Sequence, residues 1–228
     1  MTQEQDVVFK QSEGNAWFRR NAERLDNNNR PDVVRDMLNL LSPKRLELIG
    51  SVCDVGCSAG GRLDRLSTLV RPNTRLCGFD ASDDAIATGT KRYSNLDLRS
   101  GLADAPPFSE RFDLVIVSFV LHWIDRRRIV AAIAAVDQLV ADGGLLIISD
   151  FLPDHPCAQR YHHRDDIELY TYKQDYGPAF TGDRGYMEIA RHVFPHDCES
   201  HYVDVSEHQN RAMCAILAKT STDGRADL

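Results

Sequence analysis

Apolar residues lie along the chain in short runs that are separated by segments with helical spacing. Runs of this kind occupy 51–55, 75–80, 113–120, 144–151 and 211–219. The run at 113–120 is continuously apolar and rich in β-branched residues, which is typical of a strand buried on both faces. Residues 82–93 and 126–140 place apolar side chains three and four positions apart. They predict helices, and Asp142-Gly143-Gly144 is expected to stop the second one.

Strands that alternate with helices predict an α/β fold, with a parallel sheet covered on both sides. Ligands of such sheets bind at the carboxyl ends of the strands. The polar residues Asp54, Asp80, Ser118 and Asp150 lie at or near four of these ends. We therefore expect them to converge on one crevice.

The length and net charge of the chain argue against several classes of protein. The 228 residues suit one α/β domain, and the net charge of −7 comes without a basic block. A nucleic-acid surface needs clustered Lys and Arg, so none is expected. No apolar run approaches the ~20 residues of a membrane span, and the N-terminus does not resemble a signal peptide. The six scattered cysteines fit a reduced, cytoplasmic protein.

The stretch "CDVGCSAGG" at 53–61 joins the first expected strand to a helix through small residues. Small residues let a ligand approach the backbone closely. Asp80 ends the next strand, where a carboxylate can accept hydrogen bonds from both hydroxyls of a ribose. The stretch is also a degraded GxGxxG motif, so a dinucleotide remains open at this point, as does a tight turn that binds nothing.

Four ordered blocks resemble the class I S-adenosylmethionine-dependent methyltransferases over residues 50–151. They are "VCDVGCSAG", "CGFDASDDAIATGTKRY", "GLADAPPFSERFDLVIVSFVLHWID" and "VADGGLLIISDF". The resemblance implies S-adenosylmethionine as cofactor and a Rossmann-like, doubly wound, seven-stranded mixed sheet with an N-terminal helical lid. It implies one methyltransferase domain over 1–228. Its expected parts are a lid at 1–45, a cofactor-binding core at 46–150, a substrate insertion at 151–185 and a C-terminal completion of the sheet at 186–228.

The resemblance also implies roles for single residues. The expected cofactor contacts are Asp54, Gly56, Ser58, Gly60, Asp80, Ala81, Ala103, Asp104 and Ser118. Within this set, Asp54 and Gly56 flank the methionine part, Asp80 holds the ribose, and Asp104 binds the adenine amino group. Ser58 stands where many members have Gly, and Leu102 stands where many have an acid. Carboxylates at these positions suit a cationic sulfonium better than a pyrophosphate.

Methyl transfer mainly requires alignment, and a base helps when the acceptor is a hydroxyl or an ammonium. His122 follows the fourth expected strand and is the first candidate base, with a purely structural histidine as the alternative. His162 and His163 are further candidates. Their spacing with His155 and Cys157 fits no common zinc pattern, so no metal is expected.

The acceptor is expected to be a small polar molecule, such as a sugar, a nucleotide-linked metabolite or a natural product. Candidate substrate-binding residues are Arg19, Arg20, Tyr161, Arg164, Tyr172 and Lys173. They combine aromatic faces with cationic donors, which suits a polar or anionic ligand. The rival hypotheses are an NAD-type oxidoreductase and a protein that binds S-adenosylmethionine without catalysis. A monomer or a homodimer is expected.

Overall fold

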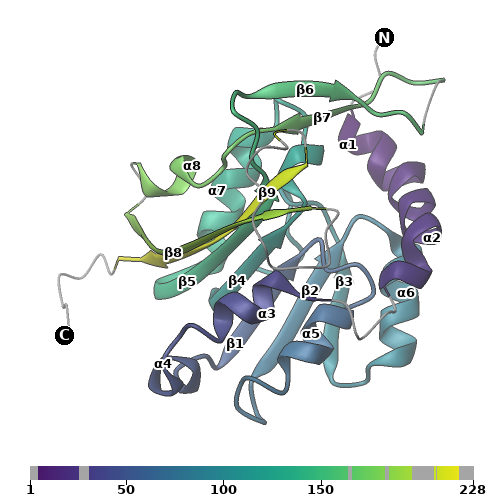
Figure 1. Ribbon diagram of the computed structural model, residues 1–228. Helices are drawn as coiled ribbons and strands as arrows, with labels where there is room; N and C mark the ends of the chain where they lie inside the picture. Colours follow the sequence, from purple (N-terminus) through teal and green to yellow (C-terminus); the bar gives the residue numbers. More distant parts are fainter. Residues whose placement is uncertain are drawn as a thin grey trace.

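The computed structural model describes residues 5–25, 31–163, 166–182, 185–196, 208 and 210–220. Its centre is a seven-stranded sheet in the order β3-β2-β1-β4-β5-β9-β8 (Figure 1). The strands are β1 (Ser51–Val55), β2 (Arg75–Asp80), β3 (Leu96–Ser100), β4 (Phe112–Ser118), β5 (Val140–Phe151), β8 (Tyr186–Pro195) and β9 (Arg211–Lys219). The five strands from β3 to β5 are parallel to one another, whereas β9 is antiparallel to both β5 and β8. The predicted doubly wound mixed sheet is therefore confirmed.

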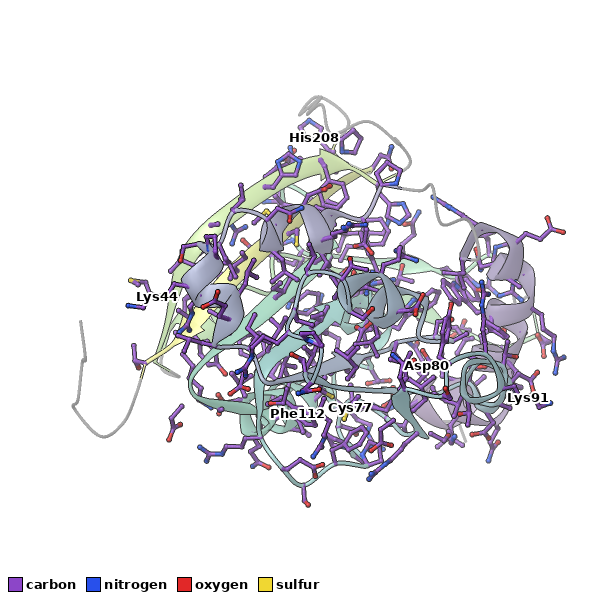
Figure 2. The ribbon with its side chains drawn as sticks, turned by 90° about the horizontal axis from the view of Figure 1, so that it is seen from below. Lys44, Cys77, Asp80, Lys91, Phe112 and His208 are labelled. Carbon is purple, nitrogen blue, oxygen red and sulfur yellow. The ribbon has the colours of Figure 1, made fainter. Side chains whose placement is uncertain are left out.

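Helices cover both faces of this sheet. The first half of the chain forms α1 (Gln5–Val8), the π-helical turn η1 (Phe9–Glu13), α2 (Gly14–Leu25), α3 (Val33–Leu38), α4 (Pro43–Glu47), α5 (Gly61–Leu66) and α6 (Asp83–Arg92). The second half adds the 3-10 turn η2 (Leu121–Trp123), α7 (Ile129–Leu139) and α8 (Pro178–Thr181). Apolar residues of α3 and α5 pack on one face of the sheet, and those of α7 and α8 pack on the other. Seen from below, Cys77 and Phe112 lie inside the molecule, while Lys44 and Lys91 lie at its margin (Figure 2).

The segment between β5 and β8 contains a second, two-stranded sheet. It consists of β6 (Cys157–Arg160) and β7 (Tyr170–Lys173), which pair antiparallel. This ribbon lies beside α1 at the end of the main sheet (Figure 1). Gln5 connects α1 to this ribbon and to η2. Its side chain donates to the backbone oxygens of Trp123 and Tyr170 and accepts from the Tyr170 amide.

The stop of the second predicted helix differs from the sequence prediction. Helix α7 ends at Leu139, and β5 starts at Val140, so Asp142-Gly143-Gly144 lies within the strand and does not stop the helix. The ammonium of Lys219 binds the carbonyl oxygens of Asp137 and Val140 and so satisfies groups at the end of the helix. The glycines instead accommodate a register shift between β5 and β4, where Gly143 has φ +73°.

Ser82 is expected to stabilise both α6 and the N-terminal segment. Its hydroxyl is buried, accepts from the Ala85 amide at the start of α6 and donates to Oδ1 of Asn15 in α2. Ser82→Ala removes both bonds and should lower the free energy of unfolding by about 1–2 kcal/mol, as for other helix caps. Urea denaturation checks this. Ser109→Ala, at an exposed loop position, should stay within about 0.5 kcal/mol; equal losses in the two variants would contradict the role of Ser82.

Candidate functional site

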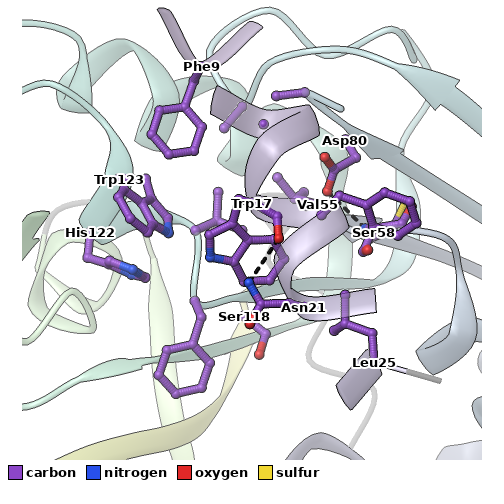
Figure 3. A pocket seen from close by; sticks show the side chains of 18 of the residues that line it. Phe9, Trp17, Asn21, Leu25, Val55, Ser58, Asp80, Ser118, His122 and Trp123 are labelled. Carbon is purple, nitrogen blue, oxygen red and sulfur yellow. Dashed lines mark hydrogen bonds between the residues drawn. The ribbon is translucent and has the colours of Figure 1, made fainter. Parts of the chain in front are cut away.

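A pocket of about 900 Å³ opens at the carboxyl ends of β1, β2, β4 and β5, beneath the N-terminal helices. Eleven of the residues singled out in the sequence line it: Gly56, Ser58, Asp80, Ala81, Ala103, Asp104, Ser118, His122, Tyr161, His162 and Lys173. Figure 3 shows that Asp80 and Ser58 lie at one side of the pocket, while His122 and Trp123 lie at the other. The expected convergence of strand ends is thus present, with the predicted cofactor residues Asp80 and Ser58 on the side opposite His122.

Three residues of the loop from β1 to α5 have a left-handed backbone conformation. Gly56, Ser58 and Gly60 have φ of +74°, +51° and +81°. The amides of Gly56 and Cys57 both donate to the carbonyl oxygen of Phe79 in β2, so the loop is tied to the neighbouring strand. A Cβ atom on Gly56 would lie 2.3 Å from Cγ2 of Val120. Glycine is therefore required at this position for both conformation and space.

Ser58 is the unusual member of this loop, because it holds a left-handed conformation that L-residues with a side chain seldom adopt. Its amide donates to Oδ2 of Asp80 at 2.9 Å. Its own hydroxyl oxygen is buried and has no hydrogen-bond partner. A buried polar atom without a partner at the wall of a pocket indicates a place where a ligand can supply the missing bond.

Asp80 is fixed by two backbone amides. Oδ2 accepts from Ser58, and Oδ1 accepts from Ser82 at 2.8 Å. Burial raises the pKa of Asp80, and the bonds from the two amides oppose this shift. The carboxylate is thus held rigidly at the end of β2, where its remaining lone pairs can accept hydrogen bonds from a ligand in the pocket.

Arg62 lines the pocket, and the sequence analysis did not identify it as a site residue. Its guanidinium donates to the hydroxyl of Ser118 at 3.0 Å. Its Nη1 lies 3.5 Å from Oδ1 of Asp54, and its Nε lies 3.6 Å from Oδ1 of Asp32. Arg65 completes the cluster with a 2.8 Å hydrogen bond to Oδ2 of Asp32. The only sequence signal for Arg62 is its position in the first turn after the glycine loop.

Asp54 lies next to Arg62 and does not line the pocket. It is fully buried, and neither carboxylate oxygen makes a hydrogen bond of good geometry. Burial raises its pKa to about 6, and the charge of Arg62 opposes the shift. Gly60 also faces away, because a Cβ atom there would meet Leu96 and Leu98 of the core. Asp54 and Gly60 therefore support the loop from the side that faces away from the pocket.

At the predicted adenine end, Ala81, Ala103 and Asp104 all line the pocket. Asp104 already has a protein partner, since Arg128 forms an ion pair with its Oδ2. Arg128 also lies 3.1 Å from Oδ2 of Asp6 in α1. Any ligand bond to Asp104 is therefore made to a carboxylate that a cation holds in place.

His122 is buried next to Asp150 at the end of β5. Nδ1 lies 2.8 Å from Oδ1 of Asp150, although the ring is turned away from a well-directed hydrogen bond. The His122 amide donates to Oδ2 of the same carboxylate at 3.2 Å. Asp150 does not line the pocket. Its hydrogen bond from His122 comes from the backbone amide, so Asp150 fixes the position of the His122 backbone and lies close to the ring.

The N-terminal segment closes the pocket with contacts along its length. Trp17 of α2 points into the cavity between the Asp80 side and the His122 side, and Phe9 lies above Trp123, with ring centroids 4.8 Å apart (Figure 3). Neither aromatic residue was assigned to the site from the sequence. Their signal is weak, since an aromatic residue on an N-terminal helix is also typical of core packing.

Several predicted substrate residues lie outside the pocket. Arg19 binds Asp84 of α6 on the exposed side. Arg20 donates to Glu13 and to the hydroxyl of Tyr161, so it supports a pocket residue from behind. The catalytic candidate His163 also lies outside the pocket, beside His162, with ring centroids 3.9 Å apart and ring planes tilted by 45°. Tyr172 packs under Arg126. Arg164 lies outside the described residues.

The site contains no candidate metal centre in the described part of the chain. No group of three or more His, Cys, Asp or Glu side chains is gathered there in a way that could hold an ion. The described helices include none with the length and apolar character needed to cross a membrane.

The Arg62 cluster leads to a prediction about stability and pH. Arg62→Met leaves Asp54 buried beside no cation, which should lower the free energy of unfolding by about 3 kcal/mol at pH 8. The folded-state pKa of Asp54 is already raised to about 6, so its ionisation weakens the fold as pH rises through that range. Removing Arg62 raises this pKa further, and the loss should be smaller at pH 5.

Urea denaturation at pH 5 and pH 8 measures this difference. Arg62→Lys is the matched variant, because it keeps a positive charge and should recover part of the stability at pH 8. A loss that is the same at both pH values would show that Asp54 does not depend on the charge of Arg62.

Comparisons with known proteins find similarity to methyltransferases. Residues 52–144 match the family model described as "Methyltransferase domain". An uncharacterized methyltransferase of Staphylococcus carnosus is 28% identical over 148 residues, which cover 64% of this chain and 66% of that protein. The carboxy-S-adenosyl-L-methionine synthase of Helicobacter hepaticus is 28% identical over 134 residues, covering 57% and 55%. The matches thus span just under two thirds and just over half of these relatives.

Among solved structures, the 1,6-didemethyltoxoflavin-N1-methyltransferase of Burkholderia thailandensis is similar with a TM-score of 0.68. The two chains share 12% identity, and the alignment covers 94% of this chain and 88% of the other. That structure contains 1,6-didemethyltoxoflavin and S-adenosylhomocysteine. At this identity the likeness shows a shared fold.

Proposed function

We propose that the chain is a class I S-adenosylmethionine-dependent methyltransferase, a proposal supported by the match of residues 52–144 to the methyltransferase-domain model, and that it methylates an oxygen or nitrogen of a small-molecule acceptor. The observation that carries the proposal is the carboxylate of Asp80, which two backbone amides hold at the end of β2 in the wall of the pocket. A rigid carboxylate there suits the two hydroxyls of a ribose.

The residues of the pocket fit S-adenosylmethionine. The unsatisfied hydroxyl of Ser58 and the carboxylate of Asp80 offer polar contacts at one end. We assign the ribose to Asp80, the adenine side to Ala81, Ala103 and Asp104, and the methionine side to Gly56 and Ser118. Arg62, which donates to Ser118, would attract the negative carboxylate of that methionine side.

When bound, S-adenosylmethionine supplies a methyl group that is activated by a positively charged sulfur. The protein then has to orient the acceptor and exclude water, because alignment of the reacting groups supplies most of the rate enhancement. Trp17, Phe9 and Trp123 cover the pocket between its two ends and would keep water out. His122 would accept the proton that an acceptor hydroxyl or amine loses, with Asp150 close to the ring.

The proposal also covers the acceptor side of the pocket and the cellular compartment of the protein. The ribbon of β6 and β7 supplies Gln159, Arg160, Thr171 and Lys173 to the pocket, which supports a role for 151–185 in acceptor binding. The dimensions of the pocket suit a small molecule. The five described cysteines are all free thiols, which supports a reducing compartment such as the cytoplasm.

Asp80→Asn tests the cofactor site directly. The variant removes the charge that the ribose hydroxyls would bond, and it should weaken S-adenosylhomocysteine binding by about 10- to 100-fold, because a bond to a charged group contributes about 1.5–3 kcal/mol. Isothermal titration calorimetry measures the affinity, and circular dichroism checks the fold. Asp97→Asn is the control, since Asp97 pairs with Arg99 on β3 and does not line the pocket.

The same titration separates the rival functions. Binding of NAD in preference to S-adenosylmethionine would overturn the proposal in favour of an oxidoreductase. Binding of S-adenosylmethionine without transfer of its labelled methyl group to any member of a small-molecule acceptor panel would favour a protein that only binds the cofactor.

His122→Gln tests the proton acceptor. With an acceptor found in that panel, turnover at saturating substrate should fall by about 10²- to 10⁴-fold if His122 acts as a base. The affinity for S-adenosylhomocysteine should change less than twofold, roughly, since His122 lies at the far side of the pocket from Asp80 (Figure 3). If turnover falls by the same factor at all pH values, His122 has a structural role. The pH profile of turnover is therefore recorded for the unchanged protein and for His122→Gln.

A further inference from the structure

We propose that Arg128 and Asp6 hold the carboxylate of Asp104 in the orientation that accepts a hydrogen bond from the amino group of adenine. They would thereby make the cofactor site select adenine over a 6-oxopurine, in which an oxygen replaces that amino group. This selection rests on the proposed function, in which Asp104 lies on the adenine side, and it adds two positioning residues to the same site. The three side chains form a row with Arg128 between the two acids, which we call the Arg128 clamp.

Arg128 supports both acids from outside the pocket. It directly precedes α7, and its Nε donates to Oδ2 of Asp104 at 2.5 Å, while Nη2 contacts the same oxygen. Nε also lies 3.1 Å from Oδ2 of Asp6 in α1. Both acids line the pocket, whereas Arg128 does not. Charge-assisted contacts of a planar guanidinium fix direction as well as distance, so the clamp restricts how the Asp104 carboxylate can turn.

The two arginines that precede Arg128 in the sequence bind other side chains. Arg127 binds Asp125, and Arg126 lies over the Tyr172 ring. Neither of them lines the pocket. Of the three arginines at 126–128, Arg128 is thus the one whose side chain reaches the acids of the pocket wall.

The backbone that carries Asp104 is fixed as well. Residues 102–105 form a turn, which a 3.0 Å hydrogen bond closes between the amide of its last residue and the oxygen of its first. Just before this turn, the Gly101 amide donates to the backbone oxygen of Asp80 at 3.0 Å. The turn with Asp104 is therefore attached to the strand end with Asp80, the residue that we assign to the ribose.

Asp6 connects the clamp to the N-terminal segment. Its side chain is buried, and it belongs to the short helix α1. The neighbouring Gln5 donates to the backbone oxygens of Trp123 and Tyr170, so α1 is anchored on the rest of the protein. Arg128 is thus held from two directions, and the N-terminal segment takes part in the position of Asp104.

The clamp leaves one oxygen of Asp104 for a ligand. Oδ2 is bound to Arg128, and Oδ1 accepts no hydrogen bond from the part of the chain that the structure describes. An ionised carboxylate accepts hydrogen bonds and donates none. The amino group of adenine is a donor, whereas the oxygen of a 6-oxopurine is an acceptor. An acceptor placed against Oδ1 leaves both groups without a bond, which disfavours the 6-oxopurine.

Selection requires that the carboxylate be held, because one that turns freely can bind either base. A 6-oxopurine carries a hydrogen on ring nitrogen N1, next to its oxygen, and a carboxylate that shifts toward N1 can accept from it. Loss of the guanidinium would also leave Asp6 and Asp104 beside each other. Burial raises the pKa of Asp6, Arg128 lowers it and Asp104 raises it. Two neighbouring acids without a cation retain a proton, and a protonated carboxyl group can donate to an oxo group.

Two ligands measure the selection by calorimetry on the full chain. S-adenosylhomocysteine carries the amino group, and S-inosylhomocysteine carries an oxygen in its place. We expect the unchanged protein to bind the first about 10- to 100-fold more tightly, which is the range for a hydrogen bond to a charged group. Equal affinity for the two would overturn the inference, whereas failure of S-adenosylhomocysteine itself to bind would contradict the proposed function.

Variants of the clamp locate the effect. Arg128→Met should lower the ratio of the two dissociation constants at least about fivefold, because Asp104 can then turn or retain a proton. Arg128→Lys keeps a positive charge without the planar fork and should recover part of the ratio. Asp6→Asn should lower the ratio about two- to threefold, since Arg128 still binds Asp104. Both dissociation constants come from the same variant, so their ratio does not depend on the fraction of molecules that can bind.

Arg111→Met is the matched control. Arg111 forms an exposed ion pair with Asp142 and does not line the pocket, so the ratio should equal that of the unchanged protein. If Arg128→Met or Asp6→Asn also keeps the ratio of the unchanged protein, the residue concerned does not position Asp104, and the inference fails.

Discussion

Four aspartates at one edge of the sheet determine how the site is built, because a carboxylate that leaves water must find donors. Asp54 lies beside Arg62, Asp80 takes two backbone amides, Asp104 takes Arg128, and Asp150 lies against His122. The four donor sets come from different parts of the chain. The contacts of these acids therefore bring the glycine loop, α5, the start of α7 and η2 to the same edge, and the pocket forms where they meet.

The N-terminal segment is tied to both sides of this pocket. Lys10 and Asn15 bind the start of α6, next to Asp80. Gln5 binds Trp123 and the ribbon of β6 and β7, and Glu13 accepts a hydrogen bond from Tyr161 in the same region. One short helical segment thus spans the predicted cofactor and acceptor sides. A displacement of this segment would uncover both sides together, and its role as a lid stays a prediction.

The sequence predicts the parts of this arrangement that follow from short-range patterns. Buried parallel strands are continuous apolar runs, so β1, β2, β4 and β5 can be located, and the acids that end them follow directly. Strand β3 was not located, since it is short and ends in exposed residues, and β8 was missed because most of its side chains are at least partly exposed and show no alternation. An edge strand lacks the burial that produces a pattern.

The prediction of site residues from the sequence has the same limit. The place of Asp80, Ser118 and His122 at the pocket could be predicted because the first two end strands and His122 lies shortly after β4, and strand ends converge by topology. Arg62, Arg128 and Trp17 could not, since their roles depend on which way a helix is turned when it packs. Arg19 and Arg20 illustrate this dependence. They are adjacent on α2, yet one binds α6 on the outside and the other supports Tyr161.

The two sides of the pocket are opposite in chemical character, and this difference bears on the reaction. Acids fixed by amides and arginines surround the side assigned to the cofactor, whereas aromatic rings and Lys173 form the other. The acids of the first side are already held by amides and arginines, so a bound ligand meets groups whose orientation is set before it arrives. Groups that are preorganised in this way need little rearrangement when a ligand binds, and such preorganisation is the usual way in which an enzyme stabilises the charge that develops during a reaction.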